Sequence, residues 1–319
     1  MGRALITGGA GMVGRELARL LLAEGQDPVI LDIAPASKLP ADVRERVELL
    51  WGDLTNWAQV LDAVRYAKVD TIYHVGALLP PGSEQNHAAA YNVNVQGTMH
   101  VLEAARLFGV GTVVYSSTTA TFGGELPEPV PNDYAQSPVT MYGVTKVCSE
   151  QLGEYYHRRY DVNFRAVRFL SVMGPGRIPG VGWTAYTSLV VEECARGNPY
   201  VINVEPDYRL RFIYIKDAAL SLIQLARAEE HNLTHRVYSL DGFSASTQEI
   251  VEAVRRHVPG AHITISVNPD TQRIMDTQYV NVQRRPDDRP ARDDWGWKPR
   301  YTLDDAVVDF VEDVRQGRT

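Results

Sequence analysis

The chain has 319 residues, of which 45% are hydrophobic and 22% are charged, and its formal net charge is −7. This composition is typical of a globular protein with one large domain or two unequal ones. The acidic balance and the lack of a long basic run argue against nucleic acid as a partner. No apolar stretch approaches the ~18 residues that a membrane span needs.

Two cysteines, Cys148 and Cys194, lie in segments with helical patterns and have no metal-ligand spacing. They indicate buried thiols in a reducing compartment, and we expect no metal site. The first strand is expected to begin at Ala4, which leaves no space for a signal peptide before it. We therefore expect a cytoplasmic protein.

The first half of the chain alternates short apolar runs with helical patterns. Strands separated by helices of this length predict right-handed crossovers and a parallel sheet. The predicted strands are Ala4–Ile6, Val29–Leu31, Val47–Leu50, Thr71–His74, Thr112–Tyr115 and Arg165–Phe169, and the predicted helices are Val13–Ala23, Trp57–Tyr66, Ala88–Phe108 and Tyr142–Tyr160.

A glycine-rich turn, Thr7–Gly14, connects the first predicted strand to the first predicted helix. Gly8 can adopt the backbone angles of a tight turn, Gly11 has no side chain to block a pyrophosphate, and Gly14 lets the helix pack closely on the strand. The helix start presents free N–H groups and a positive dipole end to phosphates. This context predicts a dinucleotide site, formed by Gly8, Gly11, Met12, Val13 and Gly14.

Asp32 ends the second predicted strand, at the distance from the glycine turn that is typical of a ribose-binding carboxylate. A carboxylate there accepts hydrogen bonds from the ribose 2′-hydroxyl and repels a 2′-phosphate. No arginine follows it directly, since the next residues are Ile33, Ala34 and Pro35. The pattern predicts NAD, rather than NADP, as the cofactor.

The pattern changes after Ser171, where a loop rich in glycine and proline covers residues 174–182. We predict an α/β protein in which residues 1–171 form an NAD-binding domain of the Rossmann type, with a doubly wound parallel sheet. Residues 172–319 are expected to form a smaller C-terminal substrate-binding lobe, some segments of which return to the sheet. Its predicted helices are Ser188–Arg196, Asp217–Arg227, Thr247–Val258 and Leu303–Val314, and its predicted strands are Tyr200–Val204, Arg211–Ile215 and Arg236–Leu240.

Tyr142 and Lys146 are four residues apart on a predicted helix, so they share a face. A tyrosine with a pKa near 10 is a poor base at neutral pH, but a neighbouring ammonium and a positively charged nicotinamide favour the phenolate. Thr118, at the end of the preceding strand, can hold a substrate oxygen while Tyr142 takes its proton and hydride leaves to the cofactor. We therefore predict that Thr118, Tyr142 and Lys146 are catalytic.

With these motifs, the chain resembles an extended short-chain dehydrogenase/reductase of the NAD-dependent epimerase/dehydratase group. The resemblance also depends on residues 52–54, 92–98, 174–176 and 295–299 and covers essentially the whole chain. It implies that further residues bind the cofactor. These are Asp53 and Leu54 beside the adenine, Gly76 and Ala77 near the cofactor backbone, Asn94 as the residue that orients the lysine, Ser116, and Phe169 beside the nicotinamide.

Within this group the chain is most similar to the short-chain L-threonine 3-dehydrogenases, in residues 77–79, 179–186, 207–210 and 291–297. Those enzymes oxidise the hydroxyl at C3 of threonine without a metal. The resemblance implies that Thr184 meets a substrate carboxylate and that Ser83 and Glu84 lie near its polar groups. Trp183 and the segment Pro80–Ser83 depart from the family pattern and add bulk or stiffness at the mouth of the site, so a bulkier analogue stays open as the substrate.

Two other functions stay open. Nucleotide-sugar epimerases and dehydratases usually place an arginine on the substrate diphosphate, and Arg209 and Arg211 are the candidates here. Ser171 stands in place of their usual asparagine, which weakens that interpretation. A non-catalytic NAD sensor is the third hypothesis, against which the intact Thr118, Tyr142 and Lys146 argue.

The two long predicted helices, 88–108 and 142–160, carry apolar residues on more than one face. A second apolar stripe often packs against a partner subunit, although burial against the sheet would produce the same pattern. Together with the oligomeric state that the resemblance implies, this predicts a homodimer. We expect its partner to be a small-molecule substrate, with no membrane or nucleic-acid partner.

Overall fold

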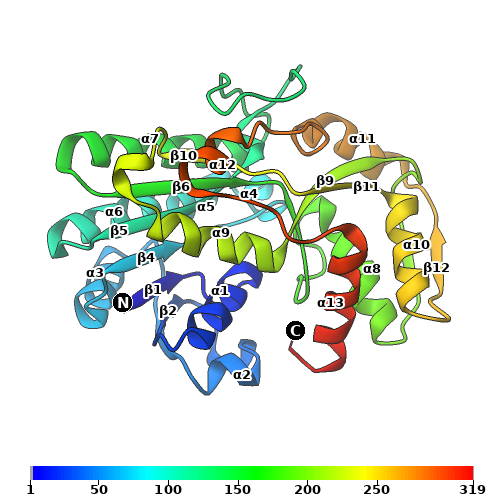
Figure 1. Ribbon diagram of the computed structural model, residues 1–319, viewed down its shortest axis with the longest axis horizontal. Coiled ribbons are helices and arrows are strands. Elements are labelled where there is room, and N and C mark those ends of the chain that lie inside the picture. Colours follow the sequence, from blue (N-terminus) through cyan, green and yellow to red (C-terminus); the bar gives the residue numbers. More distant parts are fainter. Residues whose placement is uncertain (1–2, 319) are drawn as a thin grey trace.

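The computed structural model describes residues 3–318, and its centre is a seven-stranded sheet in which all neighbouring strands are parallel. The strand order is β3-β2-β1-β4-β5-β6-β10 (Figure 1). This confirms the predicted doubly wound Rossmann-type sheet. Its strands are β1 (Ala4–Thr7), β2 (Val29–Asp32), β3 (Glu48–Trp51), β4 (Thr71–His74), β5 (Thr112–Thr118), β6 (Phe164–Phe169) and β10 (Val237–Ser239).

Helices cover both faces of this sheet because its strands carry apolar residues on both sides. Ala4 and Ile6 pack into one buried cluster and Leu5, between them, packs into another, as the alternation of a strand requires. The first cluster is covered by α1 (Met12–Ala23) and α9 (Ile215–Arg227). The second is covered by α3 (Trp57–Ala67), α6 (Gly97–Phe108) and α7 (Met141–Tyr160).

The helix predicted over residues 88–108 is divided into three parts. It begins with α5 (His87–Ala90), widens to a π-helix over Tyr91–Gln96, and continues as α6. The wider turn holds Asn94, whose carbonyl accepts bonds from Thr98 and Ser149. Such π-helical turns often occur at functional sites.

The smaller lobe has a core of its own, built from short strands and four helices on the right of Figure 1. The sheet order β11-β9-β7 and the pair β12-β8 include strands of only three or four residues that the sequence did not predict. Its elements are β7 (Ser171–Met173), α8 (Tyr186–Ala195), β8 (Tyr200–Ile202), β9 (Arg209–Tyr214), β11 (Phe243–Ser246), α10 (Thr247–His257), β12 (Ile263–Ile265), α11 (Pro269–Gln278) and α13 (Leu303–Arg315).

Segments after residue 171 return to the layers of the large sheet. Strand β10 pairs with β6, helix α9 packs on α1, and Trp297 is buried in the same apolar cluster. The remaining short elements are α2 (Ala41–Arg44), α4 (Gly82–Gln85), α12 (Arg289–Trp295) and 3-10 turns at Ala36–Lys38, Thr119–Thr121, Trp183–Ala185, Glu230–Asn232 and Val280–Val282.

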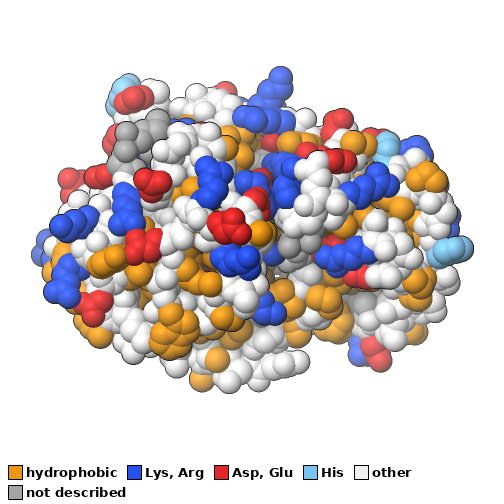
Figure 2. All heavy atoms as spheres, turned by 90° about the horizontal axis from the view of Figure 1, so that it is seen from below, with side chains coloured by type: hydrophobic (Ala, Val, Ile, Leu, Met, Phe, Trp, Pro, Cys, Tyr) orange, Lys and Arg blue, Asp and Glu red, His pale blue; other side chains and the backbone are white. Residues whose placement is uncertain are grey.

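The surface in Figure 2 carries acidic and basic side chains that are intermixed. Within residues 3–318, no helix combines the length and apolar character needed to cross a bilayer. In the same described part of the chain, no cluster of three or more metal-ligating side chains occurs.

Candidate active site

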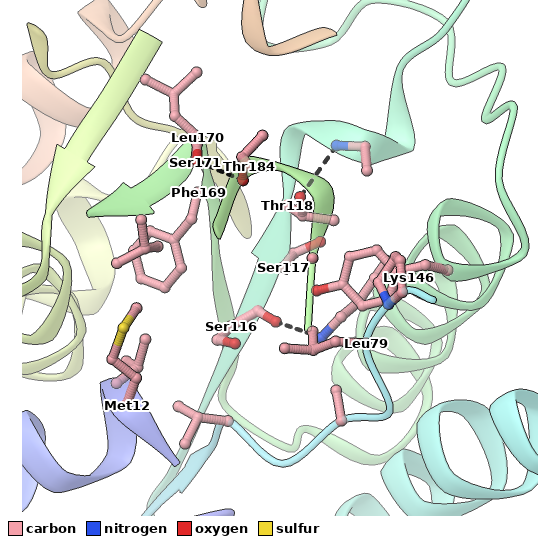
Figure 3. A pocket seen from close by; sticks show the side chains of 18 of the residues that line it. Met12, Leu79, Ser116, Ser117, Thr118, Lys146, Phe169, Leu170, Ser171 and Thr184 are labelled. Carbon is pink, nitrogen blue, oxygen red and sulfur yellow. Dashed lines mark hydrogen bonds between the residues drawn. The ribbon is translucent and has the colours of Figure 1, made fainter. Parts of the chain in front are cut away.

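A cavity of about 300 Å³ lies at the carboxyl ends of β1, β4, β5 and β6, where the smaller lobe meets the large sheet. This is the edge at which open parallel sheets bind their ligands. Figure 3 shows Met12 and Phe169 on one side of this cavity and Lys146 and Leu79 on the other. The predicted residues that line it are Gly8, Gly11, Met12, Val13, Gly14, Gly76, Ala77, Ser116, Thr118, Tyr142, Lys146, Phe169 and Thr184.

The glycine turn leaves space that any side chain would fill. Gly8 has a φ of +68°, and a Cβ on it would lie 2.4 Å from the Cα of Gly76. A Cβ on Gly14 would lie 2.5 Å from the carbonyl oxygen of Gly8. Helix α1 begins at Met12, so the N–H groups of its first turn lie at the cavity wall. This cradle fits the pyrophosphate of a dinucleotide.

Asp32 ends β2, the strand next to β1, and its carboxylate is fixed by main-chain donors. The N–H of Ala10 donates to Oδ2 and the N–H of Ala34 donates to Oδ1, both at 2.9 Å. A carboxylate has further lone pairs, so Asp32 can still accept bonds from ribose hydroxyls. Asp53 caps the N–H of Thr55 at 2.8 Å. Leu54 is buried and packs so closely on Gly76 and Gly97 that a Cβ on either glycine would collide with it.

Thr118, Tyr142 and Lys146 come together at the cavity, from β5 and the first two turns of α7. Lys146 is 1% exposed, and its Nζ donates to the carbonyl of Ser116 at 2.7 Å (Figure 3). The same Nζ lies 4.5 Å from the ring centre of Tyr115 and 5.5 Å from that of Tyr142. The Oγ1 of Thr118 accepts from the N–H of Ala120 at 3.1 Å, which leaves its own proton free for another acceptor.

The N-terminus of α7, which carries Tyr142, is held by two side chains. The hydroxyl of Thr140 accepts from the N–H of Gly143 at 3.0 Å. The carboxylate of Glu84 accepts from the N–H groups of Met141 and Tyr142 at 2.9 and 3.0 Å. Glu84 was expected beside the substrate, whereas here it satisfies free N–H groups at a helix start.

Burial changes the pKa of both predicted catalytic groups, Tyr142 and Lys146, in opposite directions. It raises the pKa of the Tyr142 phenol above its usual value, and Arg177 opposes this rise. It lowers the pKa of Lys146 to about 7, and Glu150 opposes this fall. In the protein without cofactor, loss of hydration outweighs the nearby cation, so the lowered pKa expected for Tyr142 depends on the positively charged nicotinamide and stays a prediction.

A buried ion pair behind the cavity fixes β6 against α7, and a serine of β5 joins it. Arg168 donates to the two oxygens of Glu150 at 2.9 and 2.7 Å, and Ser117 donates to the same carboxylate. Arg168 also donates to the carbonyl of Asn132 at 2.7 Å. Sequence reasoning missed this network, because its members lie on four separate segments and match no local motif.

The smaller lobe closes the cavity from the other side. Ser171 donates to Thr184 at 2.8 Å (Figure 3), and Asn281 donates to Thr119 at 3.1 Å. Sequence reasoning missed the contribution of α11 and the turn after it, where no motif marks the chain. The lining residues from this segment are Gln278, Tyr279, Asn281 and Val282.

Four predicted substrate residues do not line the cavity. Ser83 is buried and donates to Glu84 at 3.0 Å, and Trp183 packs against the core of the smaller lobe. The exposed Arg209 pairs with Glu249 at 2.8 Å. Arg211 donates to the two oxygens of Asp241 at 2.9 and 2.7 Å.

Asn94 also lies outside the cavity lining, next to the residues that shape it. Its amide accepts from the N–H of Leu78 at 2.7 Å and donates to the carbonyl of the same residue at 3.1 Å. It also donates to Thr145 at 3.0 Å, the residue before Lys146. Asn94 therefore ties the loop after β4 to the lysine turn of α7.

The protein family and the known proteins that this chain resembles agree with a dinucleotide site in this cavity. A sequence model described as the NAD dependent epimerase/dehydratase family matches residues 4–240. The chain is 34% identical to the mitochondrial L-threonine 3-dehydrogenase of Bos taurus over an alignment of 311 residues. This alignment covers 97% of this chain and 82% of that protein. It is 33% identical, over the full length of both, to an uncharacterized epimerase/dehydratase of Staphylococcus haemolyticus. The fold is similar to the holo form of a GalE-like L-threonine dehydrogenase from Cupriavidus necator, with a TM-score of 0.88, 28% identity, and 98% and 99% of the two chains covered.

Proposed function

The chain belongs to the NAD-dependent epimerase/dehydratase family, and we propose that it oxidises a secondary alcohol of a small, polar hydroxy acid to a ketone. NAD is its cofactor and, when bound, supplies the hydride acceptor. In the proposed reaction the carbinol carbon loses a hydride and the hydroxyl loses a proton. The products are the ketone, NADH and a proton.

One observation carries this proposal. Thr118, Tyr142 and Lys146 line the same small cavity as the glycine turn and Phe169. A proton acceptor, a hydrogen-bond donor for the substrate oxygen, and a cation are therefore within reach of one bound molecule, beside the cradle for the cofactor. A binding module would have no need of this combination.

Each of these residues has a separate task in the proposed reaction. The hydroxyl of Thr118 orients the substrate oxygen, and the phenol oxygen of Tyr142 receives the proton. The ammonium of Lys146 stabilises the phenolate through space, because it lies 5.5 Å from the ring centre. Phe169 and Leu170, both buried, exclude water from the side of the cavity that faces β6.

The size of the cavity supports a small substrate. Its volume of about 300 Å³ is at the lower end for ligand sites, and part of it must hold the nicotinamide. Arg209 and Arg211, the candidates for a nucleotide diphosphate, are paired with Glu249 and Asp241 instead. The similarity to L-threonine 3-dehydrogenases favours a 3-hydroxy acid related to threonine.

The direct test is absorbance at the NADH band after NAD is added with each member of two panels, hydroxy acids and nucleotide sugars. We expect net NADH with at least one small hydroxy acid, and none with NADP at equal concentration. The alternative, a nucleotide-sugar epimerase, is supported by the family to which the chain belongs. It predicts conversion of a nucleotide sugar without net NADH, and that result would contradict our proposal.

A further inference from the structure

One cation in the cavity has no partner within the protein. Arg177 follows β7, in the glycine-rich loop over residues 174–182, and lines the cavity with Tyr142 and Thr184. Its Nε is enclosed and has no hydrogen-bond acceptor. Within residues 3–318, no carboxylate forms an ion pair with its guanidinium. A charge that has lost its hydration requires a partner, so this guanidinium is available to an anion that enters the cavity.

The charges around the cavity have one sign. Among its lining residues only Lys146 and Arg177 have basic side chains, and none is an aspartate, glutamate or histidine. Lys146 is bonded to the carbonyl of Ser116 beside Tyr142, so it is occupied at the reaction centre. Burial lowers the pKa of Arg177, and the phenols of Tyr279 and Tyr142 oppose this fall. A low-dielectric cavity with unbalanced positive charge attracts anions.

The loop holds Arg177 in place from both sides. Arg15 donates to the carbonyl of Gly176 at 2.9 Å, and the N–H of Gly176 donates to Glu192 at 3.1 Å. The N–H of Gly182 donates to the carbonyl of Pro80 at 2.7 Å. The guanidinium lies along Gly182, where a Cβ would come within 3.0 Å of Nη2. The cation is thus positioned before any substrate arrives, which lowers the entropic cost of binding.

We propose that Arg177 binds the carboxylate of the substrate and selects hydroxy acids over neutral alcohols and phosphate esters. This rests on the proposed function, because it assigns a substrate class to the same site. One planar guanidinium matches the single charge and the two oxygens of a carboxylate. A phosphate dianion beside one arginine would stay unbalanced, and the cavity of about 300 Å³ also leaves it less space.

The kinetic test compares 3-hydroxybutyrate with its neutral primary amide, and L-threonine with L-threoninamide, which keeps the ammonium but lacks the carboxylate. Arg177→Gln should lower kcat/KM for the acids about 10- to 100-fold, mainly through KM, and change that of the amides less than about threefold. Arg177→Lys should restore part of the loss. Arg209→Gln is the matched control, because Arg209 is an exposed, paired arginine outside the cavity, and it should leave all values unchanged.

Three results would overturn the proposal. The first is an equal loss for acids and amides in Arg177→Gln. The second is a weaker affinity for NAD by calorimetry in that variant, which would assign Arg177 to the cofactor. The third is a higher kcat/KM for glycerol 3-phosphate than for either acid.

A binding measurement separates this proposal from the proposed function. If the wild type oxidises none of these compounds, the proposed function fails, but the role of Arg177 is still measured by thermal unfolding of the NAD-loaded protein. Butyrate, compared with butyramide at constant ionic strength, should raise the unfolding midpoint of the wild type and Arg209→Gln but not of Arg177→Gln. The same response in all three proteins would contradict the assignment.

Discussion

At the scale of single residues, Tyr142 and Lys146 share one face of α7 but have different environments. Lys146 is almost fully buried and donates to Ser116, while Tyr142 is half-buried and is influenced electrostatically by Arg177. Two ionisable groups this close titrate as a pair when they interact strongly, so we expect the pH dependence of the reaction to follow the pair.

We expect Tyr142→Phe to lower kcat about 10²- to 10⁴-fold and to leave the Kd for NAD unchanged, because only the proton-accepting hydroxyl is lost. Lys146→Ala should lower kcat and also weaken the binding of NAD. Thr118→Ala should lower kcat less than Tyr142→Phe does. Stopped-flow absorbance and calorimetry measure the two quantities. Tyr66→Phe, at an exposed tyrosine, is the control. More than about a tenth of wild-type activity in Tyr142→Phe would exclude Tyr142 as the general base.

The pH dependence of kcat/KM should follow the Tyr142–Lys146 pair. Burial lowers the pKa of Lys146 to about 7, so the pair holds both protons below that pH and has lost one above it. The form with one proton fewer can carry the phenolate, so kcat/KM should rise about tenfold per pH unit below 7 and level off above it. A profile that instead rises through a pKa near 10 would show that the pair does not control the reaction.

Asp32→Ala should weaken NAD binding about 10- to 100-fold, because a carboxylate that accepts ribose hydroxyls is lost. The affinity for NADP should fall less or increase, since the negative charge that opposes its 2′-phosphate is also removed. Calorimetric titration with both cofactors measures the ratio. Asp62→Ala, at a pair exposed on α3, is the control. An unchanged ratio would exclude Asp32 as the ribose-binding acid.

At the scale of elements, the start of α7 depends on α4 as well as on its own sequence. Glu84, in α4, accepts bonds from the N–H groups of Met141 and Tyr142. A carboxylate at this position also interacts favourably with the positive end of the helix dipole. The helix that carries the proposed proton acceptor is thus held by a residue more than fifty positions earlier in the chain.

Glu84→Gln should lower the free energy of unfolding by about 1 kcal/mol, because the helix start loses a charged acceptor. It should also lower kcat several-fold without changing the Kd for NAD, since Tyr142 is displaced while the glycine turn is not. Urea unfolding and steady-state kinetics measure the two effects. Glu125→Gln, at an exposed loop residue, should change neither. A loss of NAD affinity in place of kcat would contradict this role.

At the scale of the whole molecule, we propose that α6 and α7 form the interface of a homodimer. Apolar side chains on these two helices stay exposed although the sheet buries their other faces, which is the arrangement of a four-helix dimer interface. The exposed residues are Met99, Leu107, Phe108, Val144, Tyr155 and Tyr160.

Light scattering at micromolar concentration should give twice the mass of one chain. Val144→Glu should shift the protein toward the monomer, because a buried charge at an interface is unfavourable. Val308→Glu is the matched control, since Val308 is 49% exposed on α13 and Val144 is 46% exposed on α7. A wild-type mass of one chain would exclude the dimer.

From the sequence alone, the large sheet could be predicted, and so could the positions of the glycine turn, of Asp32 at a strand end, and of Thr118, Tyr142 and Lys146. Each of these is encoded within a few neighbouring residues, by alternation, by the need for glycine, or by the spacing of one helical turn. Gly76 and Phe169, which only the family resemblance implied, also line the cavity.

Only the tertiary structure decided how the rest of the site is built. Several residues reach the cavity or its walls from separate segments, and no short sequence pattern marks their positions. They are Glu84, the Arg168–Glu150 pair, Tyr279 and Arg177. The direction in which the pKa of Tyr142 changes is also a tertiary property, since it depends on burial by both lobes. Chemistry that depends on one turn of chain can be predicted from spacing, whereas the electrostatics of an enclosed cavity depend on every segment that encloses it.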